Sequence, residues 1–335
     1  MRAALSESED AAVALSAVIC TYDRYELLPE AIESLRRQDA RAGPIEIIVV
    51  DNSPNQEAAA EFGRRYANLP GLTYLTEASP GLSNARNVGT AAARAGIVAF
   101  IDDDARATPS WASALIAAHA AYGGRAGIVG GRVVPRWLSE PPAWLGPKLH
   151  GYLSLIDLGD ERRELTAGEW LLGCNLSFGR DALIAAGGFA TNLGRIGPPT
   201  NLLSNEEIEL CARIRQAGKS AIYSPDAVVE HVIHTERLTQ SWFRRRAAWQ
   251  AVSDLLARPD EASVLAAKAA SRLASPLFGR RRFNPQRDRD TAQGVHDDMV
   301  MLYSATVLAL CGDDAPAARR GSSRLRGALR SLLGR

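Results

Sequence analysis

The sequence has few of the features that would assign a function on their own. Its four cysteines are scattered and include no Cys-x-x-Cys pair. Cys20 and Cys174 lie in strand-like apolar runs and are most simply buried thiols of a reducing compartment. No apolar stretch reaches the ~20 residues that a membrane-spanning helix needs, and no secretory hydrophobic segment follows the polar N-terminus. These absences make the cytoplasm the expected location.

A large excess of charge of one sign is also missing. The chain has 39 basic and 38 acidic side chains, with a formal net charge of +1, which argues against general nucleic-acid binding. Basic residues gather at the C-terminus, where residues 319–335 contain six arginines and no acid. We expect a disordered tail there, with an amphipathic helix on an anionic membrane surface as the alternative.

The 335 residues are 46% hydrophobic, which is enough for a sizeable core and fits one large domain with an extension. Strand candidates at 15–20, 45–50, 72–75 and 97–101 are separated by helix candidates at 26–38, 56–66 and 84–94. This alternation is typical of βαβ units, so an α/β fold with a mainly parallel sheet between two layers of helices is expected. No Gly-x-Gly-x-x-Gly follows the first strand, which argues against an ordinary dinucleotide site.

The second half of the chain is less regular. Residues 135–169 are rich in Pro, Gly and Trp without a clean period, and a long irregular segment of this kind is often functional. Two short strands are expected at 220–223 and 227–231, and the chain reads as helical from 240 to about 311.

Three consecutive carboxylates, Asp102, Asp103 and Asp104, follow the fourth strand candidate. The carboxyl ends of strands form the ligand-binding rim of an open α/β sheet. Asp102 and Asp104, at alternate positions, can reach one hard cation such as Mg²⁺. The alternative is an acidic turn that caps the next helix.

These aspartates belong to a series of motifs in a defined order. The series comprises Cys20-Thr21-Tyr22-Asp23-Arg24, Asp51-Asn52-Ser53, residues 81–89, the three aspartates, Gly173-Cys174-Asn175, Gly187-Gly188-Phe189, Asn205-Glu206-Glu207, and His231 with Arg237-Leu238-Thr239. From about 15 to about 253 the chain resembles the family 2 glycosyltransferases of bacterial type.

The resemblance implies the GT-A fold, a Rossmann-like α/β/α sandwich with a mainly parallel mixed sheet. The implied organisation is a flexible N-terminus at 1–14, a nucleotide-sugar-binding and catalytic domain at 15–253, a helical C-terminal extension at 254–315 and an Arg-rich tail at 316–335.

For the donor, the resemblance implies that Asp51 contacts the nucleobase, with Thr21 and Arg24 lining the same pocket. An Asx-turn with Ser53 is the alternative role of Asp51. Arg86 is implied to bind the nucleotide or its phosphates, and a helix N-terminus with a guanidinium suits an anion; the alternative is an exposed helix arginine.

For the metal, the resemblance places Mg²⁺ or Mn²⁺ on Asp104, with Asp102 and His231 as further ligands. Asp102 and Asp103 are also grouped with the donor-binding residues. A structural role for the lone His231 is the alternative.

For catalysis, the resemblance makes Glu207 the general base that deprotonates the acceptor, and Glu206 the substitute. The family usually has an aspartate where this chain has Glu207. Acids in a first helical turn also complement the helix dipole without any chemistry. Trp170 and Asn175 are candidates for acceptor binding, beside the loops at 135–169 and 194–201.

The function expected from these features is metal-dependent, inverting transfer of a sugar from a UDP- or dTDP-sugar. The acceptor is a small molecule, a saccharide or a lipid-linked compound. The alternatives are a non-catalytic nucleotide-sugar scaffold and a sugar nucleotidyltransferase, although no glycine-rich basic loop for a triphosphate is present. Peripheral contact with the inner membrane face through the Arg-rich end, and a homodimer, remain open.

Overall fold

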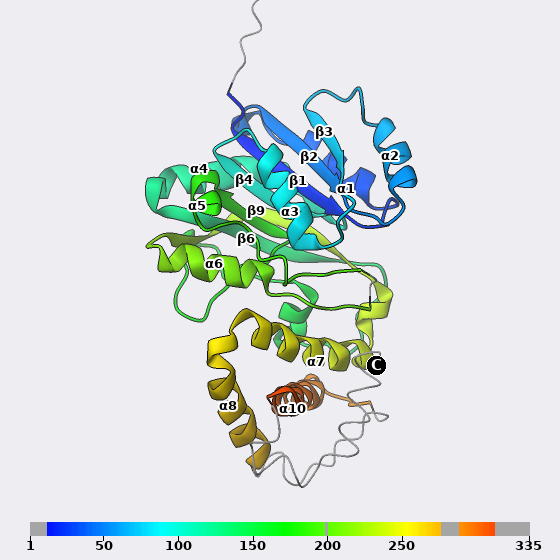
Figure 1. The fold of residues 1–335 in the computed structure, drawn as a ribbon, viewed down its shortest axis with the longest axis vertical. Coiled ribbons are helices and arrows are strands. Elements are labelled where there is room, and N and C mark those ends of the chain that lie inside the picture. The colour runs from blue at the N-terminus through cyan, green and yellow to red at the C-terminus, as the bar shows by residue number, and fades with distance from the viewer. Residues whose placement is uncertain (1–11, 198–199, 276–287, 312–335) are drawn as a thin grey trace, which may run out of the picture.

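A computed structural model describes residues 12–197, 200–275 and 288–311 (Figure 1). The expectations for the first eleven residues and for the Arg-rich tail lie outside these ranges. An α/β body carries the sheet, and a group of C-terminal helices packs below it in the view of Figure 1. Among the described residues, no helix combines the length and the apolar character needed to cross a bilayer.

The first half of the body has the predicted alternation of strands and helices. Its elements are β1 (Leu15–Thr21), α1 (Leu28–Arg36), β2 (Ile45–Asp51), α2 (Gln56–Arg64), β3 (Leu72–Thr76), α3 (Leu82–Ala92) and β4 (Ile97–Asp102). The four strands are parallel to one another. Register places Thr21 opposite Asp51 and Cys20 opposite Asp102. The carboxyl ends of β1, β2 and β4 therefore meet at one edge of the sheet.

The second half completes a mixed sheet. Its elements are β5 (Ala105–Ala107), α4 (Trp111–Tyr122), β6 (Ala126–Trp137), β7 (Arg163–Glu164), β8 (Asn175–Gly179), α5 (Arg180–Ala185), α6 (Glu206–Gln216) and β9 (Ser220–Ile233). The sheet order is β3-β2-β1-β4-β8-β6-β9-β5, with β7 beside β9. Strand β8 is antiparallel to both of its neighbours, so the sheet is mainly parallel and mixed, as expected.

One expectation about this half is wrong, because β9 is a single strand of 14 residues where two short strands were predicted. A register shift between Gly131 and Val133 of β6 lets the pairing continue past the interruption near Pro225. A Cβ at Gly131 would lie 2.7 Å from the carbonyl oxygen of Ser224. The bulge therefore depends on a residue without a side chain.

Side chains of alternate strand positions fill two apolar layers. Ile19 of β1 packs with α1, α2 and α4 on one face of the sheet, and Val18 packs with α3, α5 and α6 on the other. A Cβ at Gly89 of α3 would overlap the Cγ1 atom of Val18, so this helix lies unusually close to β1. Two helical layers around one sheet give the expected α/β/α sandwich.

The C-terminal helices are α7 (Gln240–Ala257), α8 (Ala262–Ala274) and α10 (Ala292–Leu310). Phe243 of α7 and Met299 of α10 share an apolar cluster with Ile233 of β9 and Leu149 of the irregular segment. The predicted domain boundary at 253/254 falls inside α7, since the first proline after the start of this helix is Pro259. The extension thus shares a core with the end of the body.

Candidate active site

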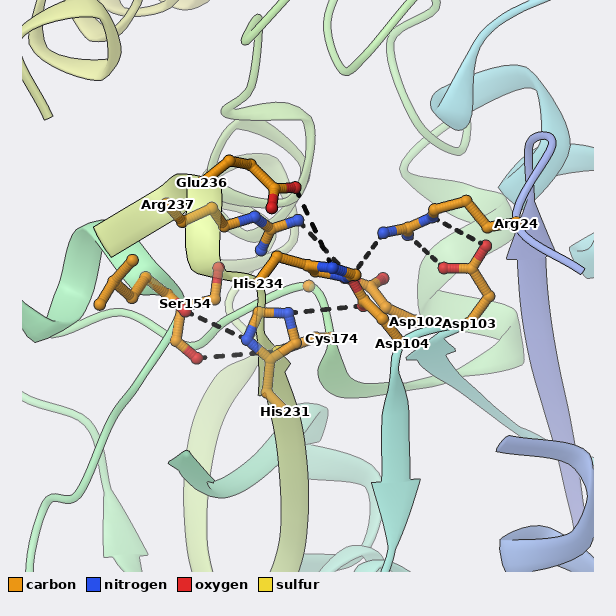
Figure 2. A network of polar contacts seen from close by, with 12 residues as sticks. Arg24, Asp102, Asp103, Asp104, Ser154, Cys174, His231, His234, Glu236 and Arg237 are labelled. Atoms are coloured by element: carbon orange, nitrogen blue, oxygen red, sulfur yellow. Dashed lines mark hydrogen bonds and ion pairs between the residues drawn. The ribbon is translucent and has the colours of Figure 1, made fainter. Parts of the chain in front are cut away.

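Two successive aspartates are tied to the loop after β1. The Thr21 hydroxyl donates to Oδ2 of Asp103 at 2.7 Å, and Nε of Arg24 donates to the same oxygen at 3.2 Å. Nη1 of Arg24 lies 2.6 Å from Oδ2 of Asp104 (Figure 2). Arg24 therefore joins the ends of β1 and β4, and it brings together three of the predicted donor residues.

Burial and neighbouring charge act differently on these two carboxylates. Burial raises the pKa of Asp103 to about 7, although the Arg24 guanidinium opposes the shift. For Asp104, burial also favours the neutral form, but Arg24 and His231 outweigh it and hold the pKa well below the usual range. Asp104 is thus the stable anion of the pair.

Asp102, Asp104 and His231 form a cluster that suits a divalent cation. One ligand atom from each lies within 4.8 Å of the others. Nε2 of His231 is 3.4 Å from Oδ1 of Asp104, and this oxygen has no hydrogen-bond partner among the described residues. Carboxylate oxygens and an imidazole nitrogen are suitable ligands for Mn²⁺ or Mg²⁺.

The orientation of His231 also fits this role. Its Nδ1 atom lies 3.1 Å from the carbonyl oxygen of Leu153, and a carbonyl can only accept a hydrogen bond. Nδ1 therefore carries a proton, and Nε2 is the atom that faces Asp104, the orientation found in histidines that bind metals. The lone histidine is part of the site, at the end of β9.

Two further nitrogen-bearing side chains approach Asp104 from the segment after β9. Nε2 of His234 lies 3.7 Å and Nη2 of Arg237 lies 3.5 Å from Oδ2 of Asp104 (Figure 2). Sequence reasoning gave His234 no role. Strand spacing would place a residue three positions after His231 on the opposite face, but β9 ends at Ile233 and the chain turns back.

A third guanidinium, that of Arg195, comes from the glycine-rich loop before α6. Loss of hydration, together with the charges of Arg237, Arg246 and Arg24, lowers the pKa of Arg195 to about 10. Its side chain nevertheless remains accessible at the surface. Sequence analysis named this loop but not Arg195, because nothing in a loop sequence specifies which side chain turns toward the site.

Arg86 of α3 is a buried link and not an exposed helix arginine. Its Nη1 atom donates to Oε1 of Glu206 at 2.7 Å, and its Nη2 atom lies 3.5 Å from Oδ1 of Asp102. The guanidinium also lies 5.9 Å from the ring centre of Phe100 and 5.3 Å from that of Phe189, within the range of cation–π attraction. Arg86 thus connects the aspartates of β4 with the start of α6.

Glu207, the predicted base, has a different environment from Glu206. Among the described residues it has no ion pair, whereas Glu206 is paired with Arg86, although the Oε2 atoms of both glutamates are buried without a hydrogen-bond partner. Burial and the charge of Glu206 raise the pKa of Glu207 to about 7, against the opposing charges of Arg86 and Arg246. A carboxylate with a pKa near neutrality is suited to accept a proton.

Asp51 takes the conformation that was the alternative at the sequence level. Its Oδ1 atom accepts a hydrogen bond from the Ser53 amide at 3.0 Å, which is an Asx-turn, and its Oδ2 atom accepts from the Tyr74 hydroxyl at 2.6 Å. The side chain is fully buried. A contact between Asp51 and a nucleobase therefore requires this buried side chain to become accessible.

None of the contacts described so far involves either candidate acceptor residue. Asn175 is fully buried: its amide donates to the carbonyl oxygens of Arg132 and Ala227 at 3.0 and 2.7 Å, and its oxygen accepts from Trp111 at 2.8 Å. All of its polar groups are used within the core, so we leave it out of the acceptor site.

Trp170 is 52% exposed. It lines a surface hollow of about 140 Å³ beside Ile208 of α6. None of the metal-site or carboxylate residues described above lines this hollow. Trp170 therefore lies on the outer side of α6, and a contact with an acceptor at this residue would be made at some distance from the cation cluster.

The chain is similar in sequence to several known proteins. Residues 16–157 match the family described as glycosyl transferase family 2. Glucosyl-dolichyl phosphate glucuronosyltransferase of Haloferax volcanii is 30% identical over 244 residues, which cover 71% of this chain and 75% of the relative. The succinoglycan biosynthesis protein ExoM of Rhizobium meliloti is 26% identical over 240 residues, covering 68% of this chain and 70% of ExoM.

A solved structure supports the same fold. The mannosyltransferase PcManGT from Pyrobaculum calidifontis, in complex with GDP-Man and Mn²⁺, superposes with a TM-score of 0.50 at 19% identity, covering 95% of this chain and 84% of that chain. The fold is therefore GT-A. The family match over residues 16–157 and the Haloferax relative together show that the chain belongs to glycosyl transferase family 2 and is a glycosyltransferase.

Proposed function

We propose that this enzyme transfers a sugar from a nucleoside-diphosphate sugar, with UDP or dTDP as the nucleotide, to an acceptor hydroxyl with inversion at the anomeric carbon. The observation that carries the proposal is the division of its carboxylates. Asp102 and Asp104 lie beside His231, and these three side chains could hold a metal ion. Glu207, in contrast, has an oxygen without a hydrogen-bond partner among the described residues and a pKa of about 7. The first pair suits a cation and the second group suits a proton.

The donor diphosphate is assigned to the cationic surroundings of Asp104. Asp104, Asp102 and His231 would hold Mg²⁺ or Mn²⁺, which when bound supplies positive charge to a departing diphosphate. Arg237 and His234 lie near the same carboxylate, and a preorganised cation such as the Arg237 guanidinium favours a transition state in which negative charge develops. The nucleoside would then lie over the strand ends that carry Thr21, Arg24 and Asp51.

The acceptor is activated by Glu207. Its carboxylate takes the proton of the acceptor hydroxyl while that oxygen forms a bond with the anomeric carbon. The bond from this carbon to the diphosphate oxygen breaks, and its electron pair leaves with the nucleoside diphosphate. One displacement inverts the configuration. Arg86 holds Glu206 in an ion pair, which leaves Glu207 as the free carboxylate of this turn.

A lipid-linked saccharide is the acceptor class that we favour. The Haloferax relative is named for transfer to glucosyl-dolichyl phosphate, and the described residues contain no membrane-spanning helix. Such an enzyme would bind its acceptor at a membrane surface. Peripheral contact of the chain with the inner membrane face would bring enzyme and acceptor together.

Thermal stability in the presence of ligands tests the donor site. The wild type, Asp104→Ala and the exposed control Asp226→Ala would be melted with UDP, dTDP, GDP or NAD, each with Mn²⁺, Mg²⁺ or EDTA. A ligand that binds only the folded state raises Tm. A metal-dependent rise with one nucleoside diphosphate, lost in Asp104→Ala and kept in Asp226→Ala, supports the proposal. No rise with any nucleotide would contradict it.

A further inference from the structure

The residue directly before the two glutamates has an unusual backbone. Asn205 precedes α6 with φ +76° and ψ 9°, the left-handed region, and its side chain makes no hydrogen bond that caps the helix. It is also buried. Asparagine enters this region more readily than most residues with a side chain, but it does so at a cost that its surroundings must offset. The angles at Asn205 set the direction in which α6 starts, and so the direction of Glu207.

Helix α7 supplies the enforcing contacts. The Nδ2 atom of Asn205 donates to Oδ1 of Asp254 at 2.7 Å, and Nε2 of Gln250 donates to Oδ1 of Asn205 at 3.0 Å. Gln250 and Asp254 are one turn apart, and they are hydrogen-bonded to each other at 2.9 Å. The amide of Ser204 also donates to the hydroxyl of Ser253 at 3.0 Å. Each polar group of the Asn205 side chain therefore has a partner on α7.

Helix α10 fixes Asp254 in turn. The hydroxyl of Tyr303 donates to Oδ2 of Asp254 at 2.6 Å, so the two oxygens of this carboxylate are bound by different helices. Arg258 adds a weaker contact at 3.5 Å, with a guanidinium that is 46% exposed. A polar chain thus runs from α10 through α7 to the first residue before α6.

We propose that the C-terminal helices position the catalytic base, and that Asp254 is the central positioning residue. The first turn of α6 is held from two sides: Arg86 of the GT-A body binds Glu206, and Asp254 of the extension binds Asn205. Glu207 directly follows these two supported residues, and its own carboxylate has no ion pair among the described residues. The inference rests on the proposed function only for the role of Glu207. The mechanical link, which is the hydrogen-bonded chain from Tyr303 through Asp254 to Asn205, does not depend on that function.

A kinetic test uses Asp254→Ala, the milder variant Tyr303→Phe and the control Asp260→Ala, an exposed aspartate three positions beyond the end of α7. In Asp254→Ala we expect kcat to fall about 10- to 100-fold, because small displacements of reacting groups have effects of this size. The KM for the donor and the metal-dependent rise in Tm should stay at wild-type values. A wild-type kcat in both variants, measured well below Tm, would overturn the proposal.

Glycine at position 205 provides a rescue test, because glycine adopts the left-handed region without support. Asp254→Ala should therefore lower kcat less in the Asn205→Gly background than in the wild type, giving a coupling in a double-mutant cycle. If Asp254 acted only by stabilising the extension, the two decreases would be equal.

Amide hydrogen exchange separates the two proposals. The Glu209 amide donates to the Asn205 carbonyl at 2.9 Å, so loosening Asn205 should speed exchange in peptides from the start of α6 but not in those from α3. Unchanged exchange in Asp254→Ala would overturn the positioning role. Full transfer activity in Glu207→Gln, with faster exchange in Asp254→Ala, would instead overturn the assignment of the base and leave the mechanical link standing.

Discussion

The Nη1 atom of Arg86 lies 2.7 Å from the Oε1 atom of Glu206, and both side chains are buried. The first residue sits on α3 and the second on α6, two helices on the same face of the sheet. Glu206 could accept a proton only by weakening this buried pair, whereas Glu207 could do so without losing a partner.

Replacing Glu206 by Ala should therefore act mainly on stability. It leaves the Arg86 charge buried without its partner, which typically costs about 3–5 kcal/mol in the free energy of unfolding. Urea denaturation would measure the loss. Glu33→Ala, which removes an exposed pair with Arg37, is the control and should change the midpoint far less. A small effect of both substitutions would show that the buried pair is not a structural link.

Replacing Glu207 by Gln should act on catalysis. The amide keeps the shape but cannot take a proton, so kcat should fall about 10²- to 10⁴-fold with little change in donor binding. Product formation under saturating donor measures this. Glu57→Gln, which changes an exposed acid in the first turn of α2, should keep full activity. If Glu207→Gln kept nearly wild-type activity, the general base would have to be another group.

The raised pKa of Glu207 predicts how activity depends on pH. The base must be ionised, so kcat/KM should decrease about tenfold per pH unit below the pKa of about 7 and level off above it. The profile measured from pH 5 to 9 checks this. A flat profile down to pH 5 would indicate a base with an ordinary carboxyl pKa.

The same rise in the pKa of Glu207 predicts that stability, unlike activity, decreases as the pH increases. The pKa rises from 4.5 to about 7 on folding, so between these values the folded state binds the proton more strongly than the unfolded state. Stability contributed by this group is present at low pH and is lost as pH rises. Glu207→Gln should therefore be more stable than the wild type at pH 8, as judged by Tm, and should lose that advantage at pH 4.

Asp103 and His231 should respond differently to substitution. Asp103 is engaged by Thr21 and Arg24, so Asp103→Ala should lower Tm but keep a metal-dependent rise with nucleotide. His231→Gln should abolish most of that rise while the effect of nucleotide in EDTA persists. Titration of Mn²⁺ in the presence of the nucleotide compares the two variants. Equal loss of metal dependence would place Asp103 among the ligands.

Asn175→Ala should destabilise the enzyme without altering acceptor use. It leaves the Trp111 indole and two carbonyl groups without partners, and unpaired buried polar groups cost about 1–3 kcal/mol each. Denaturant unfolding measures this, with the exposed Asn68→Ala as the control. A raised acceptor KM at unchanged stability would return Asn175 to the acceptor site.

Much of the fold and part of the site follow from sequence pattern. Runs of β-branched residues predict the four parallel strands, and the ends of these strands place Thr21, Asp51 and Asp102 at one edge. The continuity of β9 does not follow, since it depends on the register shift in its pairing with β6, between Gly131 and Val133. Local pattern carries no information about pairing across the sheet.

Other parts of the site depend on contacts between distant segments. Arg195 and His234 reach it from turns, where backbone direction is set by tertiary packing and not by periodicity. Asn205 and Asp254 are separated by 49 residues, so neither helical spacing nor strand alternation brings them together. The motif order nevertheless gave Glu206, Glu207 and His231 as candidates, because a family resemblance records the result of such contacts.

The close packing of Gly89 on Val18 has a consequence for how this enzyme can vary. Arg86 lies one turn before Gly89 on the same side of α3. Any larger side chain at position 89 would lift the helix from the sheet and carry the guanidinium away from Glu206. Even an added methyl group at position 89 would therefore disturb both partners of Arg86, Asp102 at the metal site and Glu206 beside the base. We expect position 89 to tolerate less change than many residues on the surface of the site.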